Sequence, residues 1–213
     1  MRLSYPEVYE EIIRYYPLGI KDSDPQYIEY PGINLLQELC YKKNEQAAYG
    51  MWKRLVKNIK GDNSKVLHAS SESPLFDPSY TGKLLLSKVK DEVNIYSREL
   101  YFHVSVIGQF YTVYGIDRVA SNSGMQNSTM YDPIVYFFPF DIYEKWFQLV
   151  RNKIEEVYTN HKFVQYALLK LRIPLISVSG LKGPFGQHPS VFQALFASED
   201  ITGYNFKADI LYE

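Results

Sequence analysis

The sequence predicts an α+β fold in which N-terminal helices pack with a mainly antiparallel sheet. Apolar residues recur at helical spacing up to residue 60, and β-branched and aromatic residues replace this period from about residue 84. Beyond that point helices and strands do not alternate strictly, as a parallel sheet would require. With 213 residues, of which 46% are hydrophobic, the chain can bury one core. We therefore expect one domain, 1–213, with a helical part at 1–63 and a sheet-rich part at 84–213.

Capping signals place the first helices. Ser4 and Glu7 match a capping box around Pro6, which predicts a helix from there to about Tyr16. Residues 20–32 contain several Asp and Pro residues without apolar periodicity and predict a loop. Two helices parted near Lys43 are expected between residues 34 and 60. The serine- and proline-containing segment 64–83 predicts an extended excursion with a short strand at 66–68.

The remainder predicts most of the sheet and the best helix of the chain. Strands are expected at 84–96, 100–107, 110–119, 134–138, 175–178, 191–197 and 204–211. Gly108 and Gln109 fit a hairpin turn, and the polar residues 120–132 predict an exposed loop. Asp141 and Glu144 resemble a cap ahead of a long amphipathic helix at about 141–159, and a further helix is expected at 163–172. The expected apolar stripe of the long helix is Ile142, Trp146, Leu149, Val150, Ile154 and Val157.

Composition argues against several classes of protein. Cys40 is the only cysteine, so the chain can form neither an internal disulfide nor a thiol metal cluster. No segment reaches the roughly 18 to 20 apolar residues of a membrane span. The first twenty residues carry five charged side chains, unlike a secretory signal. We therefore expect a cytoplasmic protein without a membrane partner, and a formal charge of −1 gives it no global attraction to nucleic acid.

The sequence contains no linear motif of a catalytic, metal or cofactor site. His68, His103, His161 and His188 each lack a second ligand at metal-binding spacing, and no G-x-S-x-G elbow is present. The glycine-containing stretch 177–188 lacks phosphate-loop spacing, which favours a surface loop. We predict no cofactor and no catalytic residue. A small-molecule enzyme assembled only in space around His103 or His188 remains an open alternative.

Charge and aromatic content favour binding over catalysis. The tyrosine-rich chain has 20 Tyr, and its charge is uneven: −4 over residues 1–38 and +5 over residues 42–65. Tyrosine often serves recognition surfaces, although a half-buried sheet also explains it. The leading hypothesis is a non-enzymatic protein-binding module, for example a bacterial immunity protein or antitoxin that occludes a toxin. Its expected partner-facing residues are Glu7, Glu11, Asp22 and Asp24, with Phe185 and His188 in the glycine-containing loop.

The alternative hypothesis is a nucleic-acid-binding or nucleic-acid-processing protein that uses the basic helix at 42–65. Its candidate residues are Trp52, Lys53, Arg54, Lys57 and Lys60. Cations with an aromatic neighbour can follow a phosphate backbone. A solvated helix face that balances the acidic N-terminal segment is the simpler explanation of the same pattern.

Overall fold

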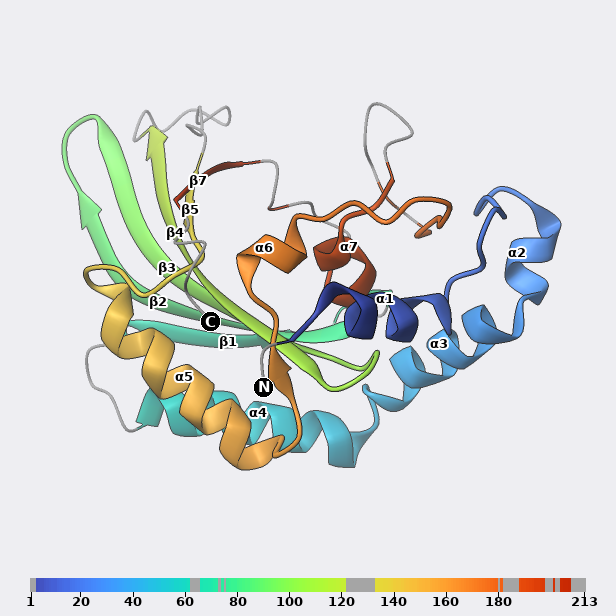
Figure 1. The fold of residues 1–213 in the computed structure, drawn as a ribbon. Helices are drawn as coiled ribbons and strands as arrows, with labels where there is room; N and C mark the ends of the chain where they lie inside the picture. Colours follow the sequence, from blue (N-terminus) through green and yellow to red (C-terminus); the bar gives the residue numbers. More distant parts are fainter. Residues whose placement is uncertain are drawn as a thin grey trace.

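The structure of the chain, a computed structural model, describes residues 3–61, 66–72, 74, 76–121, 133–179, 181, 188–197, 201 and 204–207. Helices pack with a mostly antiparallel sheet, so the predicted α+β class is confirmed. Figure 1 shows a strongly curved sheet with helices on both of its faces. Within the described residues, no helix is long and apolar enough to cross a membrane.

The sheet is built around three long consecutive strands. These are β2 (Ser79–Lys90), β3 (Asn94–Ser105) and β4 (Phe110–Ser121), each paired antiparallel with the next. β1 (His68–Glu72) adds to the β2 edge. Beyond β4 follow β5 (Ile134–Tyr136) and, parallel to it, β7 (Asn205–Lys207), while the short β6 (Lys162–Phe163) pairs in parallel with the start of β4.

The turns explain where these strands end. Asp91 closes the β2–β3 hairpin, because its carboxylate accepts hydrogen bonds from the backbone N–H groups of Val93 (2.8 Å) and Asn94 (2.6 Å). The predicted turn at Gly108 and Gln109 connects β3 to β4, and Gly108 has a φ of +61° that glycine adopts without strain. The strand predicted at 84–96 was placed too late, since β2 begins at Ser79 and ends at Lys90, before the turn at Asp91.

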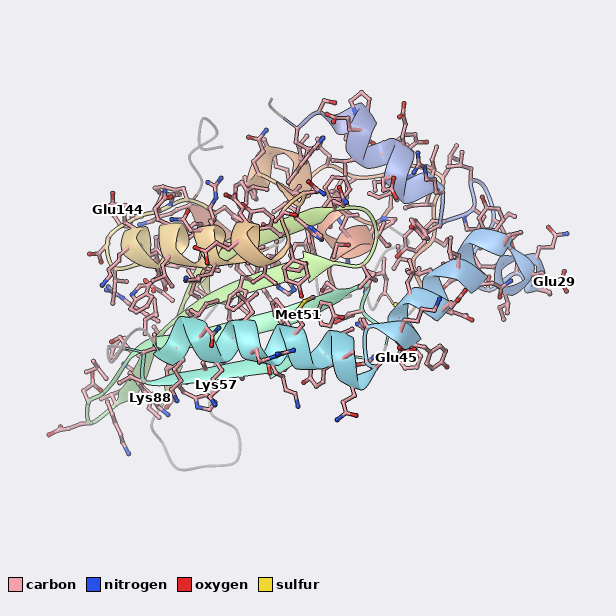
Figure 2. The ribbon with its side chains drawn as sticks, turned by 90° about the horizontal axis from the view of Figure 1, so that it is seen from below. Glu29, Glu45, Met51, Lys57, Lys88 and Glu144 are labelled. Carbon is pink, nitrogen blue, oxygen red and sulfur yellow. The ribbon has the colours of Figure 1, made fainter. Side chains whose placement is uncertain are left out.

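One face of the sheet is covered by two long helices, α4 (Gln46–Gly61) and α5 (Tyr143–Val157), which lie side by side in Figure 2. Trp52 of α4 is completely buried there, with its ring 5.3 Å from Tyr80 and 5.5 Å from Phe102. On α5 the buried residues are Tyr143, Trp146, Phe147, Val150 and Ile154. The predicted stripe was thus partly wrong: Tyr143 and Phe147 replace Val157, which is exposed.

The opposite face of the sheet is covered by α1 (Tyr5–Ile13), α6 (Tyr166–Leu169) and α7 (Val191–Leu195) (Figure 1). The capping box predicted for α1 is present, since Glu7 accepts hydrogen bonds from the backbone N–H (3.0 Å) and the hydroxyl (2.8 Å) of Ser4. Two further helices, α2 (Pro25–Glu29) and α3 (Pro31–Lys42), lie at the end of the molecule opposite the β2–β3 hairpin.

Three predictions for the N-terminal part have clear outcomes. The separation of two helices near Lys43 is confirmed, because α3 ends at Lys42 and α4 begins at Gln46. The loop expected at 20–32 was wrong, since α2 and the start of α3 occupy much of it. Each of these helices begins with a proline, Pro25 or Pro31, whose fixed φ suits the first helical position. The short strand expected at 66–68 lies instead at His68–Glu72.

Several predictions for the C-terminal part were wrong. Residues 191–197 form no strand: Val191–Leu195 are helix α7, which begins with a capping box made by Ser190 and Gln193. Residues 175–178 form no strand, and Leu175 has a φ of +65°. The helix expected at 163–172 is reduced to the four residues of α6. Of the strand expected at 204–211, residues 205–207 form β7, and 208–211 lie outside the described residues, as does most of the loop 120–132.

Asp141 does not cap α5. The N-cap residue of α5 is Ile142, and no side-chain cap is formed. Asp141 precedes this residue and has a φ of +50°, outside the range of a right-handed helix. The Asp141 carboxylate instead accepts a hydrogen bond from Arg98 Nη1 at 3.2 Å. Arg98 also lies 3.6 Å from the carboxylate of Asp117, which accepts a hydrogen bond from the Tyr143 hydroxyl at 2.6 Å. Long-range contacts between the sheet and the start of α5 therefore replace the local cap that the sequence predicts.

Candidate functional site

The surface with the clearest interaction chemistry is the segment 18–42, which includes α2 and α3 and is called the acidic arm below. Two lysines, Lys21 and Lys42, stand against four acids, so its net charge is −2. The acids are Asp22, Asp24, Glu29 and Glu38. Figure 2 shows Glu29 at one end of the molecule and Lys88 and Glu144 at the other. The arm is therefore an acidic end remote from the hairpin of the sheet.

Large apolar side chains are exposed among these acids. Ile28 and Tyr41 are each 63% exposed, and Leu18 and Leu35 are about half exposed. Leu175, also 63% exposed, is adjacent, because its carbonyl accepts a hydrogen bond from the Gly19 N–H at 2.7 Å. Exposed apolar and aromatic side chains that are surrounded by polar ones are typical of protein-binding surfaces.

The acidic arm is anchored firmly to the rest of the protein. Tyr27 is buried, and its hydroxyl donates a hydrogen bond to the carbonyl of Ser177 at 2.8 Å. Gly32 at the start of α3 packs against the end of α1, where an added Cβ would lie 2.4 Å from the Arg14 carbonyl oxygen. The exposed side chains are therefore presented by a fixed backbone, and binding through them would cost little ordering entropy.

The two predicted acids of the arm have different surroundings. The Asp24 carboxylate accepts a hydrogen bond from the backbone N–H of Lys21 at 3.1 Å and so closes the turn before α2. Asp22 is exposed, and neither it nor Glu29 makes an ion pair within the described part of the chain. Asp22 and Glu29 are therefore the acids of the arm that are free to meet a basic partner.

The other two predicted acids lie on α1, beside a separate open pocket of about 330 Å³. Glu7 and Glu11 line this pocket with Lys162 and the turn residues 108–110. Glu7 forms an ion pair with Lys162 at 2.9 Å, and Glu11 one with Arg14 at 2.8 Å. The hydrogen bond to Lys162, together with those from Ser4, lowers the pKa of Glu7 to about 2. Both carboxylates are thus paired within the chain: the Glu7 pair joins α1 to β6, and the Glu11 pair is local to the end of α1.

The basic helix divides into a buried and an exposed part. Trp52 lies in the core and is not available to a partner. Lys53, Arg54 and Lys57 are exposed on the outer face of α4, and Lys53 Nζ lies 4.8 Å from the ring centroid of Tyr49. Helical periodicity already indicated this division, because Trp52 belongs to the same apolar stripe as Leu55, Val56 and Ile59.

The two remaining predicted residues, Phe185 and His188, belong to the glycine-containing loop. Phe185 lies outside the described residues. His188 is exposed, and its backbone carbonyl accepts a hydrogen bond from Arg172 Nη1 at 3.4 Å. No described contact brings His188 to the acids of the arm or to the cations of α4.

His103, the other histidine considered for catalysis, is buried in the interior. Its Nε2 lies 2.9 Å from the Tyr114 hydroxyl and its Nδ1 lies 3.0 Å from Thr81 Oγ1. Only 3% of the residue is exposed, and this burial lowers its pKa to about 3, so the ring is neutral. An imidazole without access to solvent cannot reach a substrate, and its hydrogen bonds join neighbouring strands. Within the described residues, no three His, Cys, Asp or Glu side chains gather as a metal ion would require.

One polar cluster of the sheet was not predicted from the sequence. The Glu99 carboxylate lies 2.8 Å from Lys83 Nζ and 3.2 Å from Arg118 Nε, and it accepts a hydrogen bond from the Tyr101 hydroxyl at 3.0 Å. These four residues come from β2, β3 and β4. Strand alternation could have placed each on this face, but only the strand register brings them together. Because the charges satisfy one another, the cluster is better explained as cross-strand stabilisation than as a binding site.

Comparison with known proteins identifies no relative: no protein-family model, no curated protein and no solved structure matches this chain. Its function must therefore be inferred from its own surface.

Proposed function

We propose that this chain is a protein-binding module whose acidic arm docks onto a basic protein partner. The supporting observation is the exposure of Ile28, Leu35 and Tyr41 on a rigidly anchored segment of net charge −2. Aromatic and aliphatic anchors supply most of the binding energy in protein interfaces. Surrounding acids add attraction to a basic partner and disfavour acidic ones.

An immunity or antitoxin role is the finer form of this proposal. Enzymes that act on nucleic acids carry basic surfaces, because their substrates are polyanions. The acidic arm, with its exposed apolar side chains, complements such a surface. It could cover an active site without any catalytic group of its own. The partner expected from this chemistry is a basic toxin that acts on nucleic acid.

Site-specific crosslinking tests whether the arm is the binding surface. A photoreactive amino acid replaces Tyr41 on the arm or, as the control, Val93 at the tip of the β2–β3 hairpin; both positions are 63% exposed. In the native host we expect one specific protein adduct from position 41 and none from position 93. Equal crosslinking from both positions, or none from position 41, would overturn the proposal.

A matched pair of charge reversals tests the electrostatic part. Glu29→Lys and Glu144→Lys change the net charge equally at opposite ends of the molecule (Figure 2). Glu29→Lys is expected to reduce capture of the crosslinked partner about tenfold or more, the scale of a lost interfacial charge pair. Glu144→Lys should leave capture unchanged.

The toxin hypothesis has its own test. The partner identified by crosslinking is expressed alone and together with this chain, and growth of the host is measured. An antitoxin should restore growth, and Glu29→Lys should weaken the protection. A partner that is harmless when expressed alone would exclude the antitoxin role while leaving protein binding intact.

A further inference from the structure

A second surface, independent of the acidic arm, carries the opposite charge. The outer face of α4 presents four exposed cations, Lys53, Arg54, Lys57 and Lys60, and the helix contains no carboxylate. We propose that this face binds the phosphate backbone of a nucleic acid without reading its sequence.

The positive charges of the four cations are not neutralised by carboxylates within the described part of the protein. Some other exposed basic side chains form ion pairs, such as Lys42 with Glu38 and Lys162 with Glu7. None of the four α4 cations forms an ion pair among the described residues. Lys53 lies over the Tyr49 ring, and Arg54 Nε donates to the Gly50 carbonyl at 3.4 Å. Their charges therefore remain available to an anionic ligand.

The arrangement on the helix suits a line of phosphates. Lys53, Lys57 and Lys60 follow one another at spacings of four and three residues, which places them in one stripe, with Arg54 on its flank. At a rise of about 1.5 Å per residue the stripe is about 10 Å long. The opposite side of the helix is fixed in the core by Trp52, so the stripe is held in place before any ligand binds.

The surroundings of the stripe favour nucleic acid over other polyanions. A helix that binds in a membrane interface inserts its apolar face, but the apolar face of α4 is buried against the sheet. A surface that binds an acidic protein would be expected to expose apolar anchor residues. Among the described residues of α4, however, Met51 is the one large apolar side chain that is exposed, at 40%. Exposed cations with few apolar neighbours are what backbone phosphates require.

The salt dependence of binding gives a quantitative test. Binding of a short fluorescein-labelled DNA duplex is measured by fluorescence anisotropy, with an RNA duplex of the same length as the second probe. Four phosphate contacts predict a slope of about −3.6 for log K against log salt. Raising the salt from about 50 to about 200 mM should therefore weaken binding roughly a hundredfold. Because the contacts are to phosphates, the sequence of the duplex should have little effect.

Two triple variants separate the α4 stripe from net charge. Lys53→Gln/Lys57→Gln/Lys60→Gln leaves Arg54 as the one remaining contact of the four, so the slope should become shallower, from about −3.6 to about −0.9. The control Lys21→Gln/Lys145→Gln/Lys170→Gln removes the same charge from exposed positions elsewhere and should keep the wild-type slope. Circular dichroism and thermal melting verify that both variants fold.

Three outcomes would overturn the inference: no binding of either duplex at low salt, equal loss in both triple variants, or binding to phosphatidylserine-containing vesicles and not to the duplexes. Glu29→Lys should leave the salt slope unchanged. The α4 inference and the proposed function of the arm can therefore fail separately.

Discussion

The hydroxyl of Tyr27 donates a hydrogen bond to the main-chain carbonyl of Ser177, and this 2.8 Å contact joins segments 150 residues apart in sequence. Burial raises the pKa of Tyr27 to about 12, so the phenol stays protonated and remains a donor near neutral pH. The bond orients α2 and with it the exposed Ile28 and Glu29. The acidic arm thus depends on a contact that no local sequence pattern contains.

Tyr27→Phe is expected to loosen the arm without unfolding the protein. The substitution removes the hydroxyl that donates to the Ser177 carbonyl. The loss of this hydrogen bond should lower the unfolding free energy by about 1 kcal/mol. Hydrogen exchange should accelerate in α2 before it does in the sheet. Tyr41→Phe, at an exposed tyrosine of the same arm, is the control and should change neither measurement. Unchanged exchange in α2 would show that this bond does not hold the arm.

The parts of the fold with local signals could be predicted from the sequence. Helical periodicity placed α4 and its buried Trp52, and the capping box of Ser4 and Glu7 placed the start of α1. The helix at Val191–Leu195 was missed even though Ser190 and Gln193 form the same motif, because its β-branched and aromatic residues suggested a strand. A local capping signal prevailed there over side-chain propensity.

The candidate site was only partly predictable. Asp22 and Asp24 were identified by their charge, but their segment was expected to be a loop, so α2 and the exposed apolar residues of the arm were not expected. The pairing of Glu7 with Lys162 joins residues 155 positions apart and could not be derived from spacing. Charge can be counted in a sequence, whereas its neutralisation depends on the tertiary fold.

Lys43 is expected to be essential for stability. Its ammonium is buried and donates hydrogen bonds to the carbonyls of Pro74 (2.6 Å), Ser79 (2.9 Å) and Asp77. Lys43→Met removes all of these charge-assisted hydrogen bonds to main-chain carbonyls, so it should lower the unfolding free energy by about 3 kcal/mol or more. Lys42→Met, next to it on the exposed side, should cost less than about 0.5 kcal/mol. Urea denaturation of both variants checks the difference, and similar midpoints would contradict this role.

Gly108→Ala is expected to destabilise the β3–β4 turn. Alanine is strained at a φ of +61°, and its Cβ would lie 2.7 Å from both Glu11 Cγ and a Phe110 ring carbon. A cost of about 1 to 2 kcal/mol follows from the backbone strain and the displaced side chains. Gly50→Ala has the opposite expectation, because this glycine lies within α4 with open space around it and alanine favours a helix by up to about 1 kcal/mol. Thermal melting should therefore shift downwards for the first variant and upwards for the second.

The burial of His103 leads us to expect that the protein loses stability in mild acid. Its pKa is near 3 in the folded protein because of burial, whereas an unfolded histidine titrates near 6.5. Above pH 6.5 neither state binds the proton, so the full stability is present. As the pH falls from 6.5 towards 3 only the unfolded state binds it, which should cost up to about 4 to 5 kcal/mol in total. Urea denaturation from pH 7 to pH 4 measures this slope.

The matched variants His103→Gln and His68→Gln assign that slope to one residue. His103→Gln removes the titrating group, so its stability should vary less with pH than that of the wild type, although it is lower at pH 7 because hydrogen bonds to Thr81 and Tyr114 are lost or rearranged. His68 is exposed on β1, and its replacement should leave the wild-type pH profile in place. Carboxylates such as Glu7 also lose stabilising charge in acid, but at lower pH and equally in all three proteins. A His103→Gln profile parallel to that of the wild type between pH 6.5 and pH 4 would therefore show that the buried imidazole does not control acid stability.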